Sequence, residues 1–251
     1  MDKISILNID ICSVSLNELL PQLKKGVLVT PNVDHLVKLQ KDKEFLNCYK
    51  SAEWVICDSK ILNLAAKFIN RPFKEVIPGS SFFPAYYNYH KNNKEIKIFL
   101  LGASKGVAKE AMKKINAHIG WEMVVGEYSP TYGFENNPSE CQSIINMLNA
   151  STANVLVVGL GAPKQEKWIM KYKSQLPKMN LFMALGATID FEAGNIKRAP
   201  MVFQKLYLEW LYRLYKEPKR LFKRYVIDDI PFFSLILKQK FNKYENPEGI
   251  F

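Results

Sequence analysis

Short apolar runs alternate with longer segments of helical periodicity along most of the chain. Six runs are rich in aliphatic and aromatic residues and are bounded by polar or turn residues, a pattern that predicts β-strands. The predicted strands are Gly26–Thr30, Trp54–Cys57, Ile96–Leu101, Met123–Glu127, Val155–Gly159 and Leu181–Leu185. The helices expected between them are Asp34–Tyr49, Lys60–Phe68, Ser81–His90, Lys105–Ile119, Glu140–Asn149 and Lys164–Leu176.

This alternation predicts an α/β fold. Strands that are apolar on both faces and separated by helices form a mostly parallel sheet with helices on both faces. Ligands of such sheets bind at the carboxyl ends of the strands, where the connecting loops gather. We therefore expect the functional residues among those that directly follow the predicted strands.

The pattern changes after Gly194. Basic and aromatic residues are interleaved from Arg198 to Tyr225, and an apolar stretch, residues 230–237, follows them. We interpret residues 1–195 as one α/β domain and residues 196–251 as a basic helical appendage. A break is expected near Pro218, because proline cannot continue a helix without losing a hydrogen bond.

Composition narrows the classes of partner. The chain carries 35 Lys and Arg against 24 Asp and Glu, a formal net charge of +11 that favours an anionic partner. Its four cysteines form no CxxC pair, so we expect buried thiols rather than disulfides or a zinc site. The N-terminus does not resemble a signal peptide, and no run of about 18 apolar residues occurs. These features favour a reduced, cytoplasmic location.

Two strand ends carry polar residues with more than one interpretation. Thr30 and Asn32 follow the first strand and suit hydroxyl or phosphate binding, but also an Asx turn or helix cap. Asp58 follows the second strand. At the mouth of the sheet its carboxylate suits a general base, although the spacing alone favours an N-cap for the helix beginning near Lys60.

Glycines mark the remaining strand ends. Gly102 begins a glycine-containing turn, which is a weak signal for phosphate binding at a helix N-terminus. Residues 159–166 give the strongest signal of the chain. Here Gly159 and Gly161 form a sharp turn, and Pro163 suits the first helical position.

Four further residues complete the candidate nucleotide site. Lys164 and Gln165 fall in the first turn of the helix after the glycines, where a diphosphate would meet free amides and a cation. Asp190 is placed to hold a ribose or base edge, or is an ordinary loop carboxylate. Tyr132 lies in a loop and is placed to stack on a base.

Metal chemistry has no sequence support. No DxD motif occurs among the predicted strands and no HExxH motif occurs anywhere, and the three histidines lie far apart. We expect no metal and no cofactor. If a nucleotide diphosphate leaves during the reaction, cationic side chains and helix N-termini must stabilise its charge.

Taken together, these strings resemble the WecG/TagA/CpsF family of glycosyltransferases, also called glycosyltransferase family 26. The resemblance covers residues 24–233. Its most specific parts are the Thr30-Pro-Asn32 and Pro78-Gly-Ser80 strings, residues 159–166, Arg198-Ala-Pro200 and residues 209–220.

The resemblance implies a Rossmann-like domain with an appendage that docks on membranes. It implies an inverting, metal-independent transfer of N-acetylmannosamine, its uronic acid or another hexose from a UDP-sugar to a polyprenyl-diphosphate-linked sugar, in cell-surface polysaccharide synthesis. Asp58 would be the general base, and Thr30, Asn32 and Gln165 would line the pocket. Arg213, Arg220 and Arg224 would meet a diphosphate. The protein would be peripheral on the inner face of the plasma membrane.

Two positions depart from the family pattern. Ser59 follows the expected base where the family often has glycine, and Val76 stands where it often has arginine. These departures leave the donor open between an N-acetylmannosamine-type sugar, glucose and a uronic acid.

Two other classes remain as alternatives. A non-catalytic nucleotide-binding or nucleic-acid-binding protein would use the basic aromatic tail, but no nucleic-acid motif is visible and no nucleic acid is expected as a partner. A dinucleotide oxidoreductase is disfavoured, because Gly159 and Gly161 are not followed by a third glycine in the required place. The oligomeric state cannot be read from the sequence.

Overall fold

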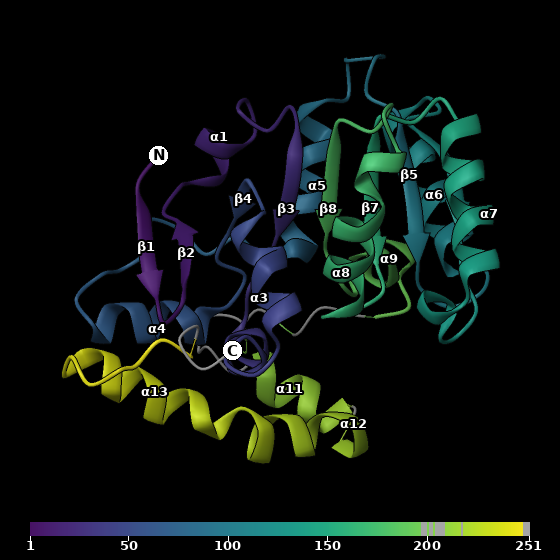
Figure 1. Ribbon diagram of the computed structural model, residues 1–251. Coiled ribbons are helices and arrows are strands. Elements are labelled where there is room, and N and C mark those ends of the chain that lie inside the picture. The colour runs from purple at the N-terminus through teal and green to yellow at the C-terminus, as the bar shows by residue number, and fades with distance from the viewer. Residues whose placement is uncertain (197–199, 201–202, 204–208, 217, 248–251) are drawn as a thin grey trace.

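The computed structural model describes residues 1–196, 200, 203, 209–216 and 218–247. Its centre is a six-stranded sheet in which all neighbouring strands run parallel (Figure 1). In spatial order the strands are β4 (Trp54–Val55), β3 (Gly26–Val29), β8 (Leu181–Ala184), β7 (Val155–Gly159), β5 (Ile98–Gly102) and β6 (Val124–Tyr128). The predicted Rossmann-like α/β fold is confirmed, and each predicted strand lies within two residues of its expected bounds.

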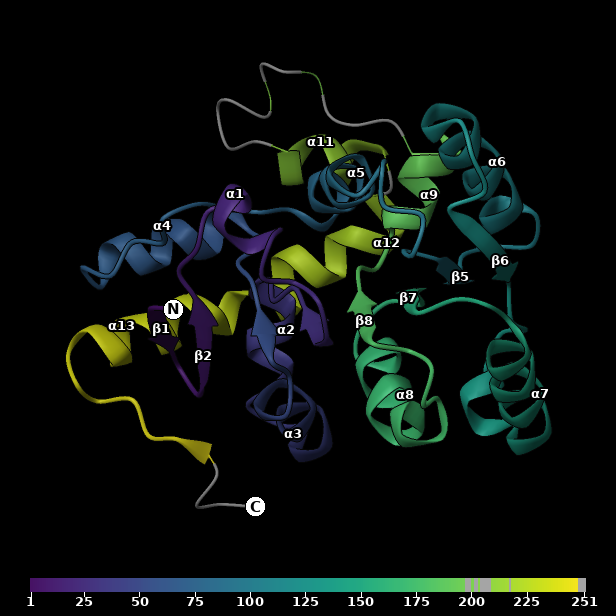
Figure 2. The ribbon, with the colours of Figure 1, turned by 90° about the horizontal axis from the view of Figure 1, so that it is seen from above.

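Helices cover both faces of the sheet (Figure 2). One face carries α2 (Val33–Lys38), α3 (Lys43–Lys50), α4 (Lys60–Phe68), α7 (Pro138–Ala150) and α8 (Lys164–Tyr172). The other carries α1 (Leu16–Leu19), α5 (Gly79–Tyr89), α6 (Val107–Ile119) and α9 (Thr188–Ala193). Strand side chains alternate between the two layers: Val27 and Val29 join the first, and Leu28 the second.

Three sequence expectations need correction. The helix predicted over Asp34–Tyr49 is two helices, because the Asp42 carboxylate accepts the Phe45 amide at 2.9 Å and caps a new start at α3. The first residues form a hairpin, β1 (Lys3–Ile6) with β2 (Ile9–Cys12), which was not predicted. Asp190 lies within α9 rather than in a loop.

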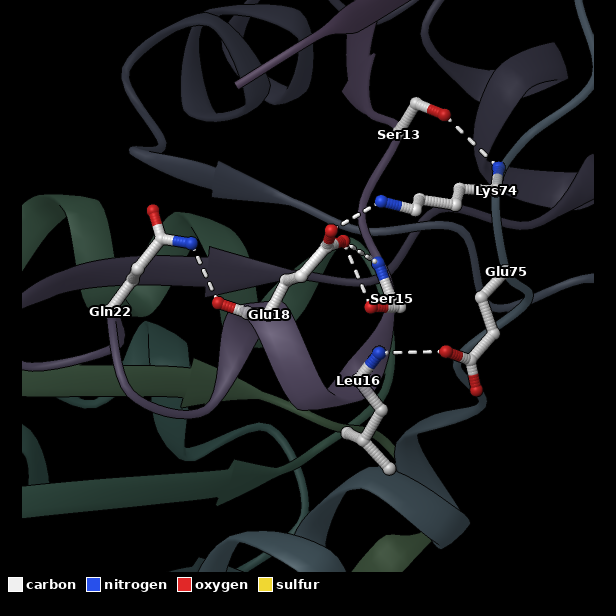
Figure 3. A network of polar contacts seen from close by, with 7 residues as sticks. All are labelled: Ser13, Ser15, Leu16, Glu18, Gln22, Lys74 and Glu75. Atoms are coloured by element: carbon white, nitrogen blue, oxygen red, sulfur yellow. Dashed lines mark hydrogen bonds and ion pairs between the residues drawn. The ribbon is translucent and has the colours of Figure 1, made fainter.

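The segment before α5 is bonded to the residues around the start of α1 (Figure 3). Lys74 forms an ion pair with Glu18, and Glu75 Oε2 accepts the Leu16 amide at 2.7 Å. Ile77 N donates to the Cys57 carbonyl at 2.7 Å. Val76 therefore lies in a segment with a defined course and packs against the core.

The appendage contains α11 (Glu209–Lys216), α12 (Pro218–Lys223), a π-helical turn (Arg224–Asp228) and α13 (Ile230–Lys240). These elements lie along the edge of the sheet toward which the strand arrows point (Figure 1). Helix α12 begins at Pro218, next to the expected break. Phe232 and Ile236 of α13 are buried in the same cluster as α2 and α4.

The far end of the appendage is tied to the start of the chain. Gln239 accepts the Leu7 amide through Oε1 at 3.0 Å and donates from Nε2 to the Ser5 carbonyl at 3.1 Å. Tyr244 donates its hydroxyl hydrogen to Gln40 Oε1 at 2.6 Å. Among the described residues, no helix is long and apolar enough to cross a membrane.

Candidate active site at the carboxyl edge of the sheet

Thr30, Asn32 and Asp58 lie together where β3 and β4 end. Thr30 is buried and donates its hydroxyl to the Ala184 carbonyl at 3.4 Å. Asn32 is the N-cap of α2 and accepts the His35 amide at 3.2 Å. The Asp58 amide donates to the Pro31 carbonyl at 3.4 Å, which joins the two strand ends. The cap that the sequence allowed at Asn32 is thus present.

The Asp58 carboxylate does not cap the helix that follows it. That position belongs to Ser59, whose Oγ accepts the Leu62 amide at 3.3 Å. Asp58 Oδ1 instead accepts the Gly79 amide at 2.9 Å, at the first residue of α5. The N-cap interpretation of Asp58 is therefore wrong for α4, and the serine that departs from the family pattern supplies the cap.

Arg224 reaches this group from the appendage. Its Nη2 lies 3.3 Å from Asn32 Oδ1 and 3.5 Å from Asp34 Oδ2. A cation is thereby held at the carboxyl end of β3, near the two strand ends that carry Asn32 and Asp58. Arg213 and Arg220 lie on α11 and α12, and their side chains are outside the part of the chain that the structure describes.

At the carboxyl ends of β5, β7 and β8, which we call the glycine half of the edge, backbone atoms of glycines lie close together. Gly102 at the end of β5 has a φ of +129°, and a Cβ there would lie 2.4 Å from the Gly159 carbonyl oxygen. A Cβ on Gly159 would lie 2.8 Å from the Gly186 carbonyl oxygen. Three neighbouring strand ends therefore approach more closely than side chains allow, which explains glycine at Gly102 and Gly159.

Gln165 connects two of these loops. Its side chain is buried, and Oε1 accepts the amides of Gly161 at 3.2 Å and Gly186 at 3.0 Å. Its Nε2 donates to Glu166 Oε1 at 2.8 Å. In this arrangement Gln165 shapes the loops around the predicted pocket through internal hydrogen bonds.

Glu166 is a buried carboxyl group that the sequence did not single out. It is fully buried, and its Oε2 has no hydrogen-bond partner among the described residues. Burial raises the pKa of Glu166 to about 7. His35, whose Nδ1 lies 2.7 Å from the Tyr49 hydroxyl, is also buried, and burial lowers its pKa to about 3. His35 is therefore neutral at neutral pH, whereas Glu166 ionises near pH 7.

The remaining predicted residues lie around the glycine half. Lys164 is the first residue of α8, forms an ion pair with Glu135, and stands 4.7 Å above the ring of Tyr132. Tyr132 is fully exposed, as stacking on a base requires. Pro163 directly precedes α8 and is joined to Ala162 by a cis peptide bond.

Asp34 is the first residue of a predicted helix and Glu166 the last residue of the string 159–166, but the sequence did not indicate the role of either. Asp34 follows Asn32 by two residues, and Glu166 directly follows Gln165. An acidic residue in the first turn of a helix usually signals only a favourable interaction with the helix dipole. Their burial, 5% exposed for Asp34 and 0% for Glu166, was the missing information.

A cavity of about 360 Å³ lies elsewhere, between the β1–β2 hairpin and the α3–β4 segment. Its lining includes Asn8, Lys50 and Glu53 and none of the residues predicted for the site. We therefore place the candidate site at the carboxyl edge because the predicted side chains converge there, and not because of this cavity.

Comparison with known proteins shows which family the chain is similar to. The profile of the "Glycosyl transferase WecG/TagA/CpsF family" matches residues 4–246. A protein of Bacillus subtilis is 30% identical over 227 residues, which cover 89% of this chain and 84% of the relative. A protein of Bacillus spizizenii is 28% identical over 201 residues, covering 80% and 75%. Both carry the name N-acetylglucosaminyldiphosphoundecaprenol N-acetyl-beta-D-mannosaminyltransferase.

Proposed function

The chain belongs to the WecG/TagA/CpsF family of glycosyltransferases, and from this membership we propose a specific transfer reaction. A hexose or an N-acetylhexosamine of the N-acetylmannosamine type moves from a UDP-sugar to a sugar carried on a polyprenyl diphosphate, in the synthesis of a cell-surface polysaccharide. The names of both Bacillus relatives support an acceptor of this class. The observation that carries the proposal is the contact of Arg224 with Asn32. It brings a cationic side chain of the appendage to the carboxyl ends of β3 and β4, where Asp58 also lies.

The proposed step is a single displacement with inversion. An acceptor hydroxyl gives its proton to the Asp58 carboxylate while its oxygen bonds to the anomeric carbon. The bond from that carbon to the UDP oxygen breaks, and UDP leaves with the electron pair. The Gly79 amide, which donates to Asp58 Oδ1 at 2.9 Å, holds the carboxyl group in one orientation and stabilises its charged form.

Fixed cations and amides are proposed to stabilise the leaving diphosphate without a metal ion. The glycine loops at Gly102, Gly159 and Gly161 would receive the diphosphate at the N-terminus of α8, beside Lys164. Arg224 would approach from the appendage, together with Arg213 and Arg220. Such groups act strongly because their orientation is set before the reaction begins.

The base and ribose of the donor would be held at the rim of the glycine half. Tyr132 offers an exposed aromatic face beside Lys164. Asp190 would accept hydrogen bonds from ribose hydroxyls or the base edge. These two assignments rest on position alone and are tested by UDP binding to their alanine variants.

The donor sugar is set by the segment around Val76 and Ser59. Ser59 caps α4, so the departure from glycine serves the helix and need not exclude a sugar. Val76 packs against the core and supplies no charge, which favours a donor that needs no additional arginine. UDP-glucose and a UDP-uronic acid are the competing donors.

The appendage is proposed to bind the inner face of the plasma membrane. Helix α13 and the residue that ends it carry an exposed apolar face. Its side chains recur every three to four residues and are Ile230, Phe233, Leu237 and Phe241. Lys238 and Lys240 lie in the last turn of the helix. An apolar face with adjacent lysines is typical of helices that lie on anionic lipid.

Activity is tested by incubating the enzyme with a panel of UDP-sugars and a short-chain lipid carrying a diphosphate-linked N-acetylglucosamine. We expect release of UDP and one new glycolipid with inverted anomeric configuration. Binding of UDP without product from any donor would favour the alternative of a non-catalytic nucleotide-binding protein. Inhibition by a chelating agent would contradict metal independence.

Membrane binding is tested by flotation with anionic liposomes. The variant carrying Phe233→Glu and Leu237→Glu should stay with the soluble fraction, whereas wild type floats. Met147→Glu, on the distant helix α7 and also exposed, is the matched control and should float like wild type. Equal flotation of all three proteins would reject this face as the membrane contact.

A further inference from the structure

Asp34 is a buried carboxylate with two cationic partners. It is the second residue of α2, and its side chain is 7% exposed. Its Oδ2 accepts a hydrogen bond from Lys38 Nζ at 2.8 Å, one turn further along the helix. The same oxygen lies 3.5 Å from Arg224 Nη2. A carboxylate this deeply buried is expected to be paired, and one of its two partners comes from the appendage.

Arg224 is held by two oxygens from one turn of chain. Its Nη2 contacts both Asp34 Oδ2 and Asn32 Oδ1. Asn32 Oδ1 already accepts the His35 amide, so its position is set by the start of α2. The guanidinium is therefore fixed against a rigid helix terminus, although 192 residues of sequence separate Arg224 from Asn32.

The surroundings leave Asp34 as the charged anchor. Asn32 is neutral, and Arg224 Nε has no hydrogen-bond partner among the described residues. A second carboxyl group, Asp229, lies near both Arg224 and Asp34, and burial raises its pKa to about 6. Within the described residues the ion pair of Arg224 is with Asp34 and not with Asp229. Asp229 Oδ1 has no partner within the described part of the chain. Asp34 is thus the carboxylate in direct contact with the guanidinium.

We propose that Asp34 is a positioning residue that anchors Arg224 at the carboxyl end of β3 for the transfer reaction. The inference rests on the proposed function, in which Arg224 stabilises a diphosphate. A guanidinium carries five N–H donors, and both contacts with α2 use Nη2. The anchor therefore fixes the cation in place without exhausting its donors, so little reorganisation is needed when negative charge develops.

The test is a double-mutant cycle on kcat/KM with Asp34→Asn, Arg224→Gln and the double variant. Asparagine keeps the size of the side chain and removes its charge. Each single substitution should lower kcat/KM by about 10- to 100-fold, and the double variant should be no worse than Arg224→Gln within about threefold. Asp34→Glu should recover part of the loss, because it restores the carboxylate.

Lys38→Met is the matched control. It removes the other partner of Asp34 and leaves the contact with Arg224, so kcat/KM should stay within about threefold of wild type. Losses that multiply in the double variant would show that Asp34 acts independently of Arg224, and would overturn the inference. A loss in Lys38→Met as large as that in Asp34→Asn would do the same.

Amide hydrogen exchange separates this inference from the proposed function. Exchange in the peptides covering Arg224–Asp228 and α13 needs no substrate. Asp34→Asn and Arg224→Gln should increase it to the same extent, and the double variant should add nothing. If exchange rises equally in all three variants but the enzyme uses no UDP-sugar, the proposed transfer is rejected and the anchoring of Arg224 by Asp34 is retained. If the enzyme forms product, but the effects of the two substitutions on exchange add and their losses in kcat/KM multiply, the anchoring role of Asp34 is rejected and the proposed transfer is retained.

Discussion

The two halves of the carboxyl edge of the sheet are held together in different ways. At β5, β7 and β8, backbone meets backbone: Gly102 touches Gly159, and one buried glutamine joins Gly161 to Gly186. At β3 and β4, polar side chains meet from distant parts of the chain, with Arg224 against Asn32 and Asp34. The first half has its shape before any ligand arrives, whereas the second depends on charged groups and on the docked appendage.

This difference separates binding from chemistry. The glycine loops offer backbone amides at the N-terminus of α8, so they suit a diphosphate that is present throughout the reaction. A set of side chains that includes a carboxylate and a cation suits the step in which a proton moves and charge develops. Substitutions in the glycine half should therefore damage folding and donor binding, and substitutions in the side-chain half should damage turnover.

The largest effect on this comparison is expected from Asp58→Asn. The amide keeps the shape of the side chain and still accepts the Gly79 amide, but it cannot take a proton. Turnover should fall by about 10²–10⁴-fold, with UDP affinity changed less than about threefold by calorimetry. Asp10→Asn, at an exposed position of the first hairpin, is the comparison variant and should keep its turnover. Turnover within a few-fold of wild type in Asp58→Asn would remove the carboxylate from its role as base.

Gly102→Ala should break the opposite half. The new Cβ would lie 2.4 Å from a backbone oxygen at a φ of +129°, so the free energy of unfolding should fall by about 2–5 kcal/mol. Gly120→Ala is the control, since its φ of +83° is also left-handed but nothing lies within 4 Å of the added carbon. Urea denaturation should show a loss of about 1–2 kcal/mol there. Equal losses would mean that the strand ends do not touch as described.

Glu166→Gln should change how the free energy of unfolding depends on pH, which tests the glycine half of the edge. The pKa of Glu166 is raised from 4.5 to about 7 on folding, so the folded state binds more protons between these values. Stability from this group is therefore complete below about pH 4.5 and is lost as the pH rises through 7. The glutamine variant does not ionise, and at pH 8 it should unfold with a free energy higher by on the order of 1–2 kcal/mol.

The check is urea denaturation from pH 5 to pH 9. Wild type should lose stability toward pH 8 relative to the variant, and the difference should shrink steadily as the pH falls toward 5. His35 changes stability in the other direction, because burial lowers its pKa from 6.5 to about 3 and stability falls as the pH drops through this range. A constant difference across all pH values would contradict a raised pKa of Glu166.

The smallest effect is expected at the boundary of the side-chain half. Ser59→Ala removes the cap on the Leu62 amide and should cost about 1 kcal/mol of unfolding free energy, whereas Ser59→Gly should cost only a few tenths. Neither should change kcat more than about threefold, since Asp58 keeps its contact with Gly79. A drop in kcat as large as that of Asp58→Asn would place the hydroxyl in the reaction.

The sequence predicted the backbone half better than the side-chain half. Residues 159–166 form one continuous string, so the turn and the helix after it could be expected together. The helix begins at Lys164, one residue after the expected Pro163, and the burial of Gln165 was not predicted. The strands were predictable because their apolar runs are buried on both faces. The hairpin of residues 3–12 was missed, since its strands have four residues each and give little periodic signal.

What the sequence could not predict are pairings across long separations. Arg224 was expected at a diphosphate, but nothing in the sequence pairs it with Asp34. The choice of Ser59 over Asp58 as helix cap was equally open, because both residues stand at an acceptable distance from α4. In the structure the Gly79 amide donates to the Asp58 carboxylate, so that carboxylate is engaged at the start of α5 and Ser59 caps α4.

The contacts of Gln239 with Leu7 and Ser5 set the order in which the molecule can be completed on the ribosome. The first hairpin is synthesised more than two hundred residues before the glutamine that joins its backbone, an interval of 234 positions for Ser5. Contacts of such long separation form late, because closing the loop costs entropy before the contact repays it. Synthesis must therefore have passed Gln239 before the first hairpin and α13 can be joined, and a chain terminated before Gln239 would lack these contacts.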